Sequence, residues 1–186
     1  MRLSRLFAAA ALAGLCGCQT AVVRDAPRPV RVAEGTVLDA APIVEALLAQ
    51  TGTVTQAVSG AWRDNAFAAE VVMRGDGQRF TAIFLAPHMR LATITLTRPH
   101  AIRYERAAQI PEMFEPEYAL ADLAFVNLDT PSLRRAAPGL RIEDDGATRR
   151  IFAGSSPLAE RRLLPGGDLR FRNLVHGYEY TIRPVR

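Results

Sequence analysis

Lysine is absent from the 186 residues, and all 23 basic side chains other than histidine are arginines. This absence excludes a Schiff-base lysine, a catalytic lysine base and the lysine of a phosphate-binding P-loop. Cysteine is scarce as well, with only Cys16 and Cys18. No apolar run approaches the roughly 20 residues that a membrane-spanning helix needs, since the longest, 6–15, has ten. The composition, 49% hydrophobic and 23% charged, is that of one globular domain.

The first 17 residues have the pattern of an export signal. Arg2 and Arg5 precede the apolar run, as in a secretory signal peptide. The following Leu15-Cys16-Gly17-Cys18 resembles the lipobox of bacterial lipoproteins, in which diacylglycerol is attached to the final cysteine. We therefore expect a signal peptide at 1–17 and lipidation, for example with palmitate, at Cys18. Cys16 fits this role poorly, because Leu15 would directly precede it. The alternative is an ordinary secreted protein with two incidental cysteines.

This resemblance also implies a cellular location. Gln19, rather than aspartate, follows Cys18, which by the usual sorting rule of such lipoproteins indicates the outer membrane. Removal of Arg2 and Arg5 would lower the net charge from +4 to +2. Three acyl chains suffice for stable anchoring. We thus expect a monomer that faces the periplasm and is held in the outer membrane by its acyl chains.

The remaining chain divides into a short N-terminal segment and one domain. Residues 18–38 contain Pro27 and Pro29 and predict a lipidated N-terminus and extended tether. The domain, 39–186, begins with a helix at 39–50, capped by Asp39. Alternating hydrophobicity then predicts five strands, at 53–63, 67–74, 79–86, 90–98 and 101–106. After an interruption, five shorter strands are predicted at 140–143, 149–153, 158–164, 168–174 and 178–184.

The interruption between the two sets of strands is helical. Residues 118–128 are apolar nearly all round, which is typical of a helix buried on several sides. A second short helix is predicted to follow, capped by Thr130 and running to Ala137. Short turns between strands favour an antiparallel meander. We predict a mainly β (α+β) fold, in which a curved antiparallel sheet or incomplete β-barrel has its concave face covered by the helical insertion.

Two short motifs resemble those of known proteins. The segment Pro116–Ala124, PEYALADLA, resembles the central motif of a family of uncharacterised Gram-negative lipoproteins, a domain of unknown function. Gly177–Ile182, GYEYTI, resembles that family's C-terminal strand. The family is placed near the LolA/LolB superfamily, whose members enclose a hydrophobic cavity between an incomplete barrel and helices. Its genes often lie beside aryl-polyene or fatty-acid-type biosynthetic genes. The resemblance, over roughly residues 40–184, implies a LolB-like fold, but no residue that accepts lipoproteins can be matched.

Motifs for other chemistry are missing. His88, His100 and His176 lack metal-ligand spacing, and Ser155 does not stand in a nucleophile elbow. A solvated helix entrance explains Glu112, Glu115 and Glu117 better than paired catalytic acids. The arginines are dispersed rather than clustered with aromatics, which argues against nucleic-acid binding. We expect no enzyme, no cofactor and no metal.

Two hypotheses for function remain. In the first, the curved sheet holds a lipid, an acyl chain or the acyl moiety of a lipoprotein, and helps to transfer it. In the second, the same side chains fill an ordinary core, and the protein is a non-catalytic, membrane-anchored interaction or assembly partner. The candidates for lining a hydrophobic groove in the first hypothesis are Trp62, Phe67, Phe80, Phe84, Leu120, Leu123 and Phe125.

Overall fold

Two antiparallel meanders of five strands each make up most of the fold. The computed structural model describes residues 20–24, 29–62, 65–87, 89–99, 101–107 and 116–185. Cys16, Cys18, His88, His100, Glu112 and Glu115 therefore lie outside the described residues. The first meander is β4 (Thr51–Trp62), β5 (Asn65–Asp76), β6 (Arg79–Ala86), β7 (Met89–Thr97) and β8 (Ala101–Arg106). The second is β9 (Leu140–Asp144), β10 (Thr148–Ala153), β11 (Ser156–Leu163), β12 (Leu169–Asn173) and β13 (Tyr178–Val185).

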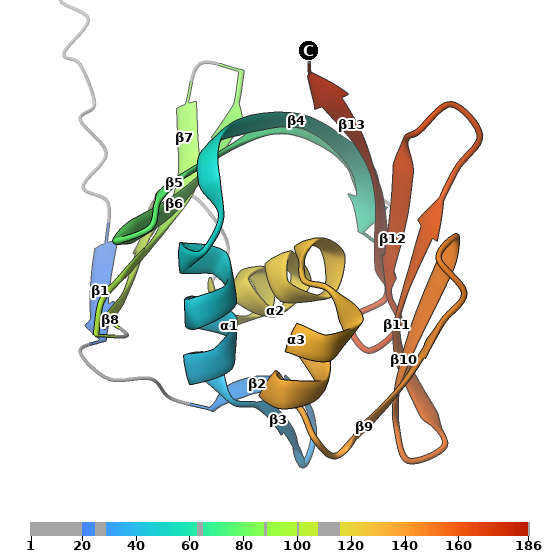
Figure 1. Ribbon diagram of the computed structural model, residues 1–186. Coiled ribbons are helices and arrows are strands. Elements are labelled where there is room, and N and C mark those ends of the chain that lie inside the picture. The colour runs from blue at the N-terminus through green and yellow to red at the C-terminus, as the bar shows by residue number, and fades with distance from the viewer. Residues whose placement is uncertain are drawn as a thin grey trace, which may run out of the picture.

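The pairing of β4 with β13 joins the two meanders into one sheet. With β1 (Thr20–Arg24) added beside β8, the order is β1-β8-β7-β6-β5-β4-β13-β12-β11-β10-β9. The sheet is large, curved and open, and it does not close into a barrel (Figure 1). The expectation of a mainly β fold with a curved antiparallel sheet is thus confirmed.

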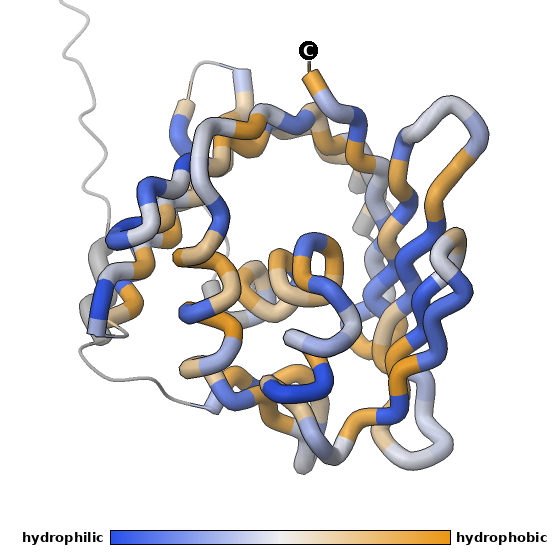
Figure 2. The backbone as a smooth tube through the Cα atoms, viewed as in Figure 1, coloured by the Kyte–Doolittle hydropathy of each residue, from blue (hydrophilic) through white to orange (hydrophobic). Residues whose placement is uncertain are grey.

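The helices lie inside the curve of the sheet, together with a small hairpin. They are α1 (Ala40–Leu48), α2 (Pro116–Asn127) and α3 (Thr130–Ala136), with β2 (Val30–Ala33) and β3 (Thr36–Leu38) below them in Figure 1. Hydrophobic and hydrophilic residues alternate along the strands in Figure 2, as expected where one face of a sheet meets a core. The core accordingly sits between the concave face of the sheet, the helices and the β2–β3 hairpin.

Local sequence explains where the helices begin. The side chain of Asp39 accepts a hydrogen bond from the Ala41 backbone N–H at 3.0 Å, so Asp39 caps α1 as predicted. The prediction that Thr130 caps the next helix is wrong, because Asp129 holds that position and accepts from the Ser132 N–H at 2.7 Å. Thr130 is instead the first residue of α3, and its hydroxyl donates to Asp144.

The segment expected to be a tether takes part in the fold. It contains three strands: β1 pairs with β8, and β2 pairs with β3. Val30 and Val32 are almost fully buried in the core, and β2 packs against α2. Alternation of Val30 and Val32 with the exposed Arg31 is the signal for this strand, although the flanking prolines favour a linker. The domain therefore includes residues N-terminal to position 39.

Candidate functional site on the inner face of the sheet

The concave face of the sheet can be followed from strand to strand through its register. Residues that pair directly across two strands point to the same face. Val71 and Met73 of β5 are buried in the core, so their partners on β4, Gln56 and Val54, also face inward. A continuous inner row crosses four strands through the pairs of Leu163 with Leu169, Leu169 with Ile182, and Ile182 with Val58.

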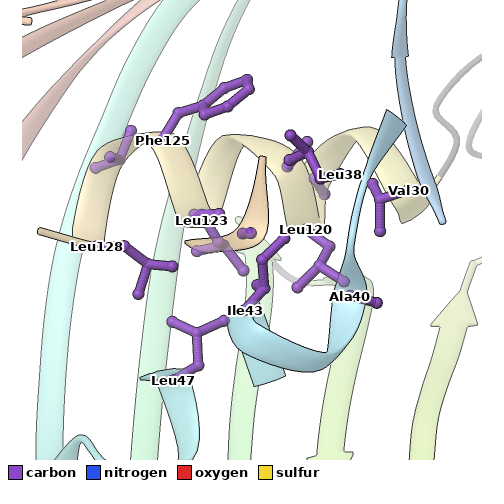
Figure 3. Close-up of a cluster of buried hydrophobic side chains, with 14 of the residues drawn as sticks. Val30, Leu38, Ala40, Ile43, Leu47, Leu120, Leu123, Phe125 and Leu128 are labelled. Carbon is purple, nitrogen blue, oxygen red and sulfur yellow. The ribbon is translucent and has the colours of Figure 1, made fainter. Parts of the chain in front are cut away.

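Four of the predicted groove residues lie in the filled core. Phe80, Leu120 and Phe125 are almost completely buried, Leu123 is 7% exposed, and all four belong to one hydrophobic cluster. In Figure 3, Leu120 and Leu123 of α2, and Leu128 just after it, lie on the side toward α1, while Phe125 points from the opposite side of the helix. Phe84 is partly buried and packs against the same cluster. The apolar circumference of α2 therefore serves packing on several sides, and the chain's own side chains occupy that space.

Beyond the helices, part of the inner face remains uncovered. Val54 is 49% exposed, Leu163 47% and Phe67 39%, although each occupies an inward-facing position. Val58, between them on the sheet, is only partly buried. We call Val54, Val58, Phe67 and Leu163 the inner apolar surface. It contains one predicted groove residue, Phe67. The backbone of Trp62 pairs with Tyr178, but the Trp62 side chain lies outside the described residues.

An arginine stands beside this surface on the same strand. Arg161 precedes Leu163 by two residues and pairs with Phe171 and Arg149, both of which are buried. Its Nε is buried and has no hydrogen-bond partner in the part of the chain that the structure describes. Burial, followed by the nearby Arg149 charge, lowers the pKa of Arg161 below its ordinary value, and Asp144 opposes this shift. The sequence gives no local sign of an inward-facing charge here, since arginines also alternate along the exposed faces of these strands.

Arg149, in contrast, is fully engaged in fixing the end of α2. Its Nη1 donates to the carbonyl oxygens of Leu128 at 2.6 Å and Phe125 at 3.3 Å, and its Nε donates to Asp144 at 2.8 Å. Hydrogen bonding from Thr130, with the Arg149 contact, lowers the pKa of Asp144 to about 2. The guanidinium thus satisfies helix carbonyls that have no partner within the helix. Its role is to connect α2 with β10.

A buried carboxyl group lies where the two sequence motifs meet. Asp122 of α2, 7% exposed, accepts hydrogen bonds from Tyr178 Oη at 2.6 Å, Tyr180 Oη at 3.3 Å and Asn173 Nδ2 at 3.3 Å. Burial raises the pKa of Asp122 to about 7, although these three hydrogen bonds oppose the shift. Burial also raises the pKa of both tyrosines well above 10, so they remain protonated donors. The predicted site residues did not include Asp122. The sequence does indicate it, because Asp122 is the one acidic residue in the apolar stretch 118–128.

The two motifs therefore form one physical contact. Asp122 comes from the PEYALADLA segment, and Tyr178 and Tyr180 come from GYEYTI. Tyr118 of the first motif also contacts the His176 ring, with ring centroids 4.0 Å apart. These contacts attach α2 to β12 and β13.

A family model described as "Protein of unknown function (DUF3261)" matches residues 53–186. The chain belongs to this family. No curated protein matches the chain. The matched region of this DUF3261 protein begins in β4 and contains α2, α3 and the second meander. Both motifs, Asp122 and Arg161 therefore lie in the DUF3261 part, whereas α1 and the three N-terminal strands precede it.

The DUF3261 protein has a pocket of about 780 Å³ between α1 and α3. Acids and one arginine are among its lining residues, including Asp39, Glu45, Asp129 and Arg135. The described parts of the chain contain no group of three or more histidine, cysteine, aspartate or glutamate side chains that could hold a metal ion. No helix among the described residues is long and apolar enough to cross a membrane.

Proposed function

We propose that this DUF3261 protein is an outer-membrane lipoprotein, anchored at Cys18, whose periplasmic domain binds an acyl chain as a monomer and without catalysis. The observation that carries the proposal is the inner apolar surface. Apolar side chains on the concave face of a sheet normally belong to the core, yet Val54 and Leu163 are about half exposed. An acyl chain lying along this surface would remove these side chains from water.

The resemblance to the LolA/LolB superfamily supports the proposal, because those proteins enclose a hydrophobic cavity between an incomplete barrel and helices. The position of the contact differs from our first expectation. The core already contains the side chains of Leu120, Leu123 and Phe125. The acyl chain would therefore lie beyond the helices rather than beneath α2. The gene neighbourhood implied by the resemblance makes a product of fatty-acid-type or aryl-polyene biosynthesis the natural ligand. Transfer of that ligand, or of a lipoprotein acyl moiety, would use the open side of the sheet.

The experiment compares two valines of similar exposure on opposite faces of neighbouring strands. Full-length protein in phosphatidylcholine nanodiscs is titrated with decanol, and binding is followed by calorimetry and by Trp62 fluorescence, with empty nanodiscs as the blank. Val54→Asp places a charge on the inner face and should weaken binding about ten-fold or more. Val185→Asp, on the outer face and at 50% exposure, should leave it unchanged. Wild-type protein that binds no decanol would contradict the proposal.

The second candidate function is an interaction or assembly protein. The filled core favours it, since Leu120, Leu123 and Phe125 of α2 are buried in one hydrophobic cluster. In that case the inner apolar surface would contact a protein segment rather than a lipid. Absence of decanol binding in the wild-type protein would favour this candidate.

A further inference from the structure

Arg161 carries a positive charge into the concave side of the sheet. Its cross-strand neighbours, Arg149 and Phe171, are both buried, and Arg149 reaches the carbonyls of α2. Arg161 therefore shares the inner face with these residues. The next residue, Arg162, is exposed and belongs to the outer face. The strand thus separates two adjacent arginines into different surroundings.

Among the described residues, Arg161 has the charge of Asp144 nearby but no acid bonded to it. In the described part of the chain no acidic side chain forms an ion pair with it, and its buried Nε has no hydrogen-bond acceptor. Asp144 is the nearest candidate, but it already accepts from Thr130, Arg149 and the Gly146 N–H. A buried donor without an acceptor normally costs free energy, and a charged one costs more. An anion beside Arg161 would remove this cost.

The apolar surface begins directly next to this charge. Leu163 follows Arg161 at the same face, about 7 Å along the strand. From Leu163 the inner row continues through Leu169 and Ile182 to Val58, across three strand spacings of about 4.8 Å each. A cation at one end of an extended apolar row matches a molecule with an anionic head and a single hydrocarbon tail.

We propose that Arg161 binds the carboxylate of a fatty acid whose tail lies along the inner apolar surface. This inference rests on the proposed acyl-binding function and adds the chemical class of the ligand. The edge of a guanidinium that carries Nε and one Nη presents two parallel N–H groups, which fit the two oxygens of a carboxylate. Binding would give the Arg161 Nε the acceptor that the described part of the chain does not provide.

The test separates recognition of the head from recognition of the tail. Full-length wild-type protein and the variants Arg161→Gln and Arg162→Gln are placed in phosphatidylcholine nanodiscs. Each is titrated with decanoate and with decanol, which share a chain length but differ in charge. We expect Arg161→Gln to weaken decanoate binding about ten-fold or more and to change decanol binding less than about two-fold. Arg162→Gln, the matched control, should leave both affinities unchanged.

Three results would overturn the inference. Unchanged decanoate binding in Arg161→Gln, while the wild-type protein binds decanol, removes the headgroup role and leaves the proposed function intact. Wild-type protein that binds neither ligand removes the proposed function and this inference with it. One measurement uses only wild-type protein, so it tests the inference even if Arg161→Gln misfolds. The carboxylate of [1-¹³C]decanoate should have a lower pKa when bound to wild-type protein than in empty nanodiscs. An unshifted pKa would also overturn the inference.

Discussion

Asp122 shows how one polar residue can connect distant parts of a chain. Its carboxyl group sits in an otherwise apolar stretch of α2, and its three hydrogen-bond donors come from β12 and β13, more than fifty residues later. Buried polar groups are retained where their hydrogen bonds are made, because an unsatisfied one costs stability. Asp122 therefore fixes the rotation of α2 against the sheet.

The titration of Asp122 predicts how stability changes with pH. The folded protein holds this proton up to a pKa of about 7, whereas the unfolded chain releases it near 3.8. Between these values the folded state binds more protons, so this group makes the free energy of unfolding fall as pH rises from about 4 to 7. Above pH 7 its contribution is constant. Asp122→Asn removes the titration, and the wild-type stability should fall relative to the variant by up to about 1.4 kcal/mol per pH unit.

Urea unfolding of both proteins at several pH values between 4 and 8 measures this difference. Taking the difference between the two proteins cancels the titration of all other groups. Parallel stability curves would show that Asp122 is ionised throughout and that burial does not raise its pKa.

Arg149 and Arg150 allow a comparison of a buried and an exposed ion pair in adjacent positions. Arg149→Met would remove the side-chain donor to the Leu128 carbonyl and the ion-pair partner of Asp144, and should lower the free energy of unfolding by about 3 kcal/mol or more. Arg150→Met removes only an exposed contact with Glu160 and should cost less than about 1 kcal/mol. Equal losses in urea unfolding would show that the connection between α2 and β10 adds no particular stability.

At the scale of elements, the junction of β4 and β13 holds the two meanders together. At this junction Gly60 pairs with Tyr180. A Cβ atom on Gly60 would lie 2.2 Å from the Glu179 carbonyl oxygen and 2.6 Å from the Tyr180 Cβ. Real side chains do not approach so closely, so the two strands can pair this tightly only because residue 60 is glycine.

Gly60→Ala should therefore strain the centre of the sheet. We expect the free energy of unfolding to fall by about 2 kcal/mol or more, since the strands must move apart to admit a methyl group. Gly139→Ala is the matched control, because no atom would contact a Cβ there within 4 Å. If thermal unfolding is unchanged in Gly60→Ala, the strands move apart at little cost, and the junction is less rigid than this contact indicates.

Local sequence patterns predicted most helices and strands, because the formation of each depends on interactions between residues that are close in sequence. β6 and β8 have the predicted bounds, since period-two alternation and turn residues define such strands. The pairing of β4 with β13 and of β1 with β8 joins residues far apart in sequence, and no local pattern carries that information. The same limit applies to the site. Hydrophobicity indicated that Phe80 and Leu120 would be buried, but only the register shows that Val54 and Leu163 remain exposed on the inner face.

At the scale of the whole molecule, the domain combines a filled core with an uncovered inner surface. The helices occupy one part of the concave side, and the sheet extends beyond them. In the proposed function, acyl chains on Cys18 attach the protein to the membrane. The position of the acyl anchor therefore determines at which membrane the inner apolar surface would bind its ligand.

The two neighbouring cysteines provide a direct test of this anchor. Sulfur is required for the thioether to diacylglycerol, so Cys18→Ala expressed in a Gram-negative host should incorporate no radiolabelled palmitate and should be absent from the outer-membrane fraction. Cys16→Ala changes a residue two positions away and leaves Gly17-Cys18 intact, so labelling and membrane location should be preserved. Palmitate incorporated into Cys18→Ala would refute the lipobox assignment. Label lost from Cys16→Ala alone would move the acylation site to Cys16, and with it the start of the mature chain.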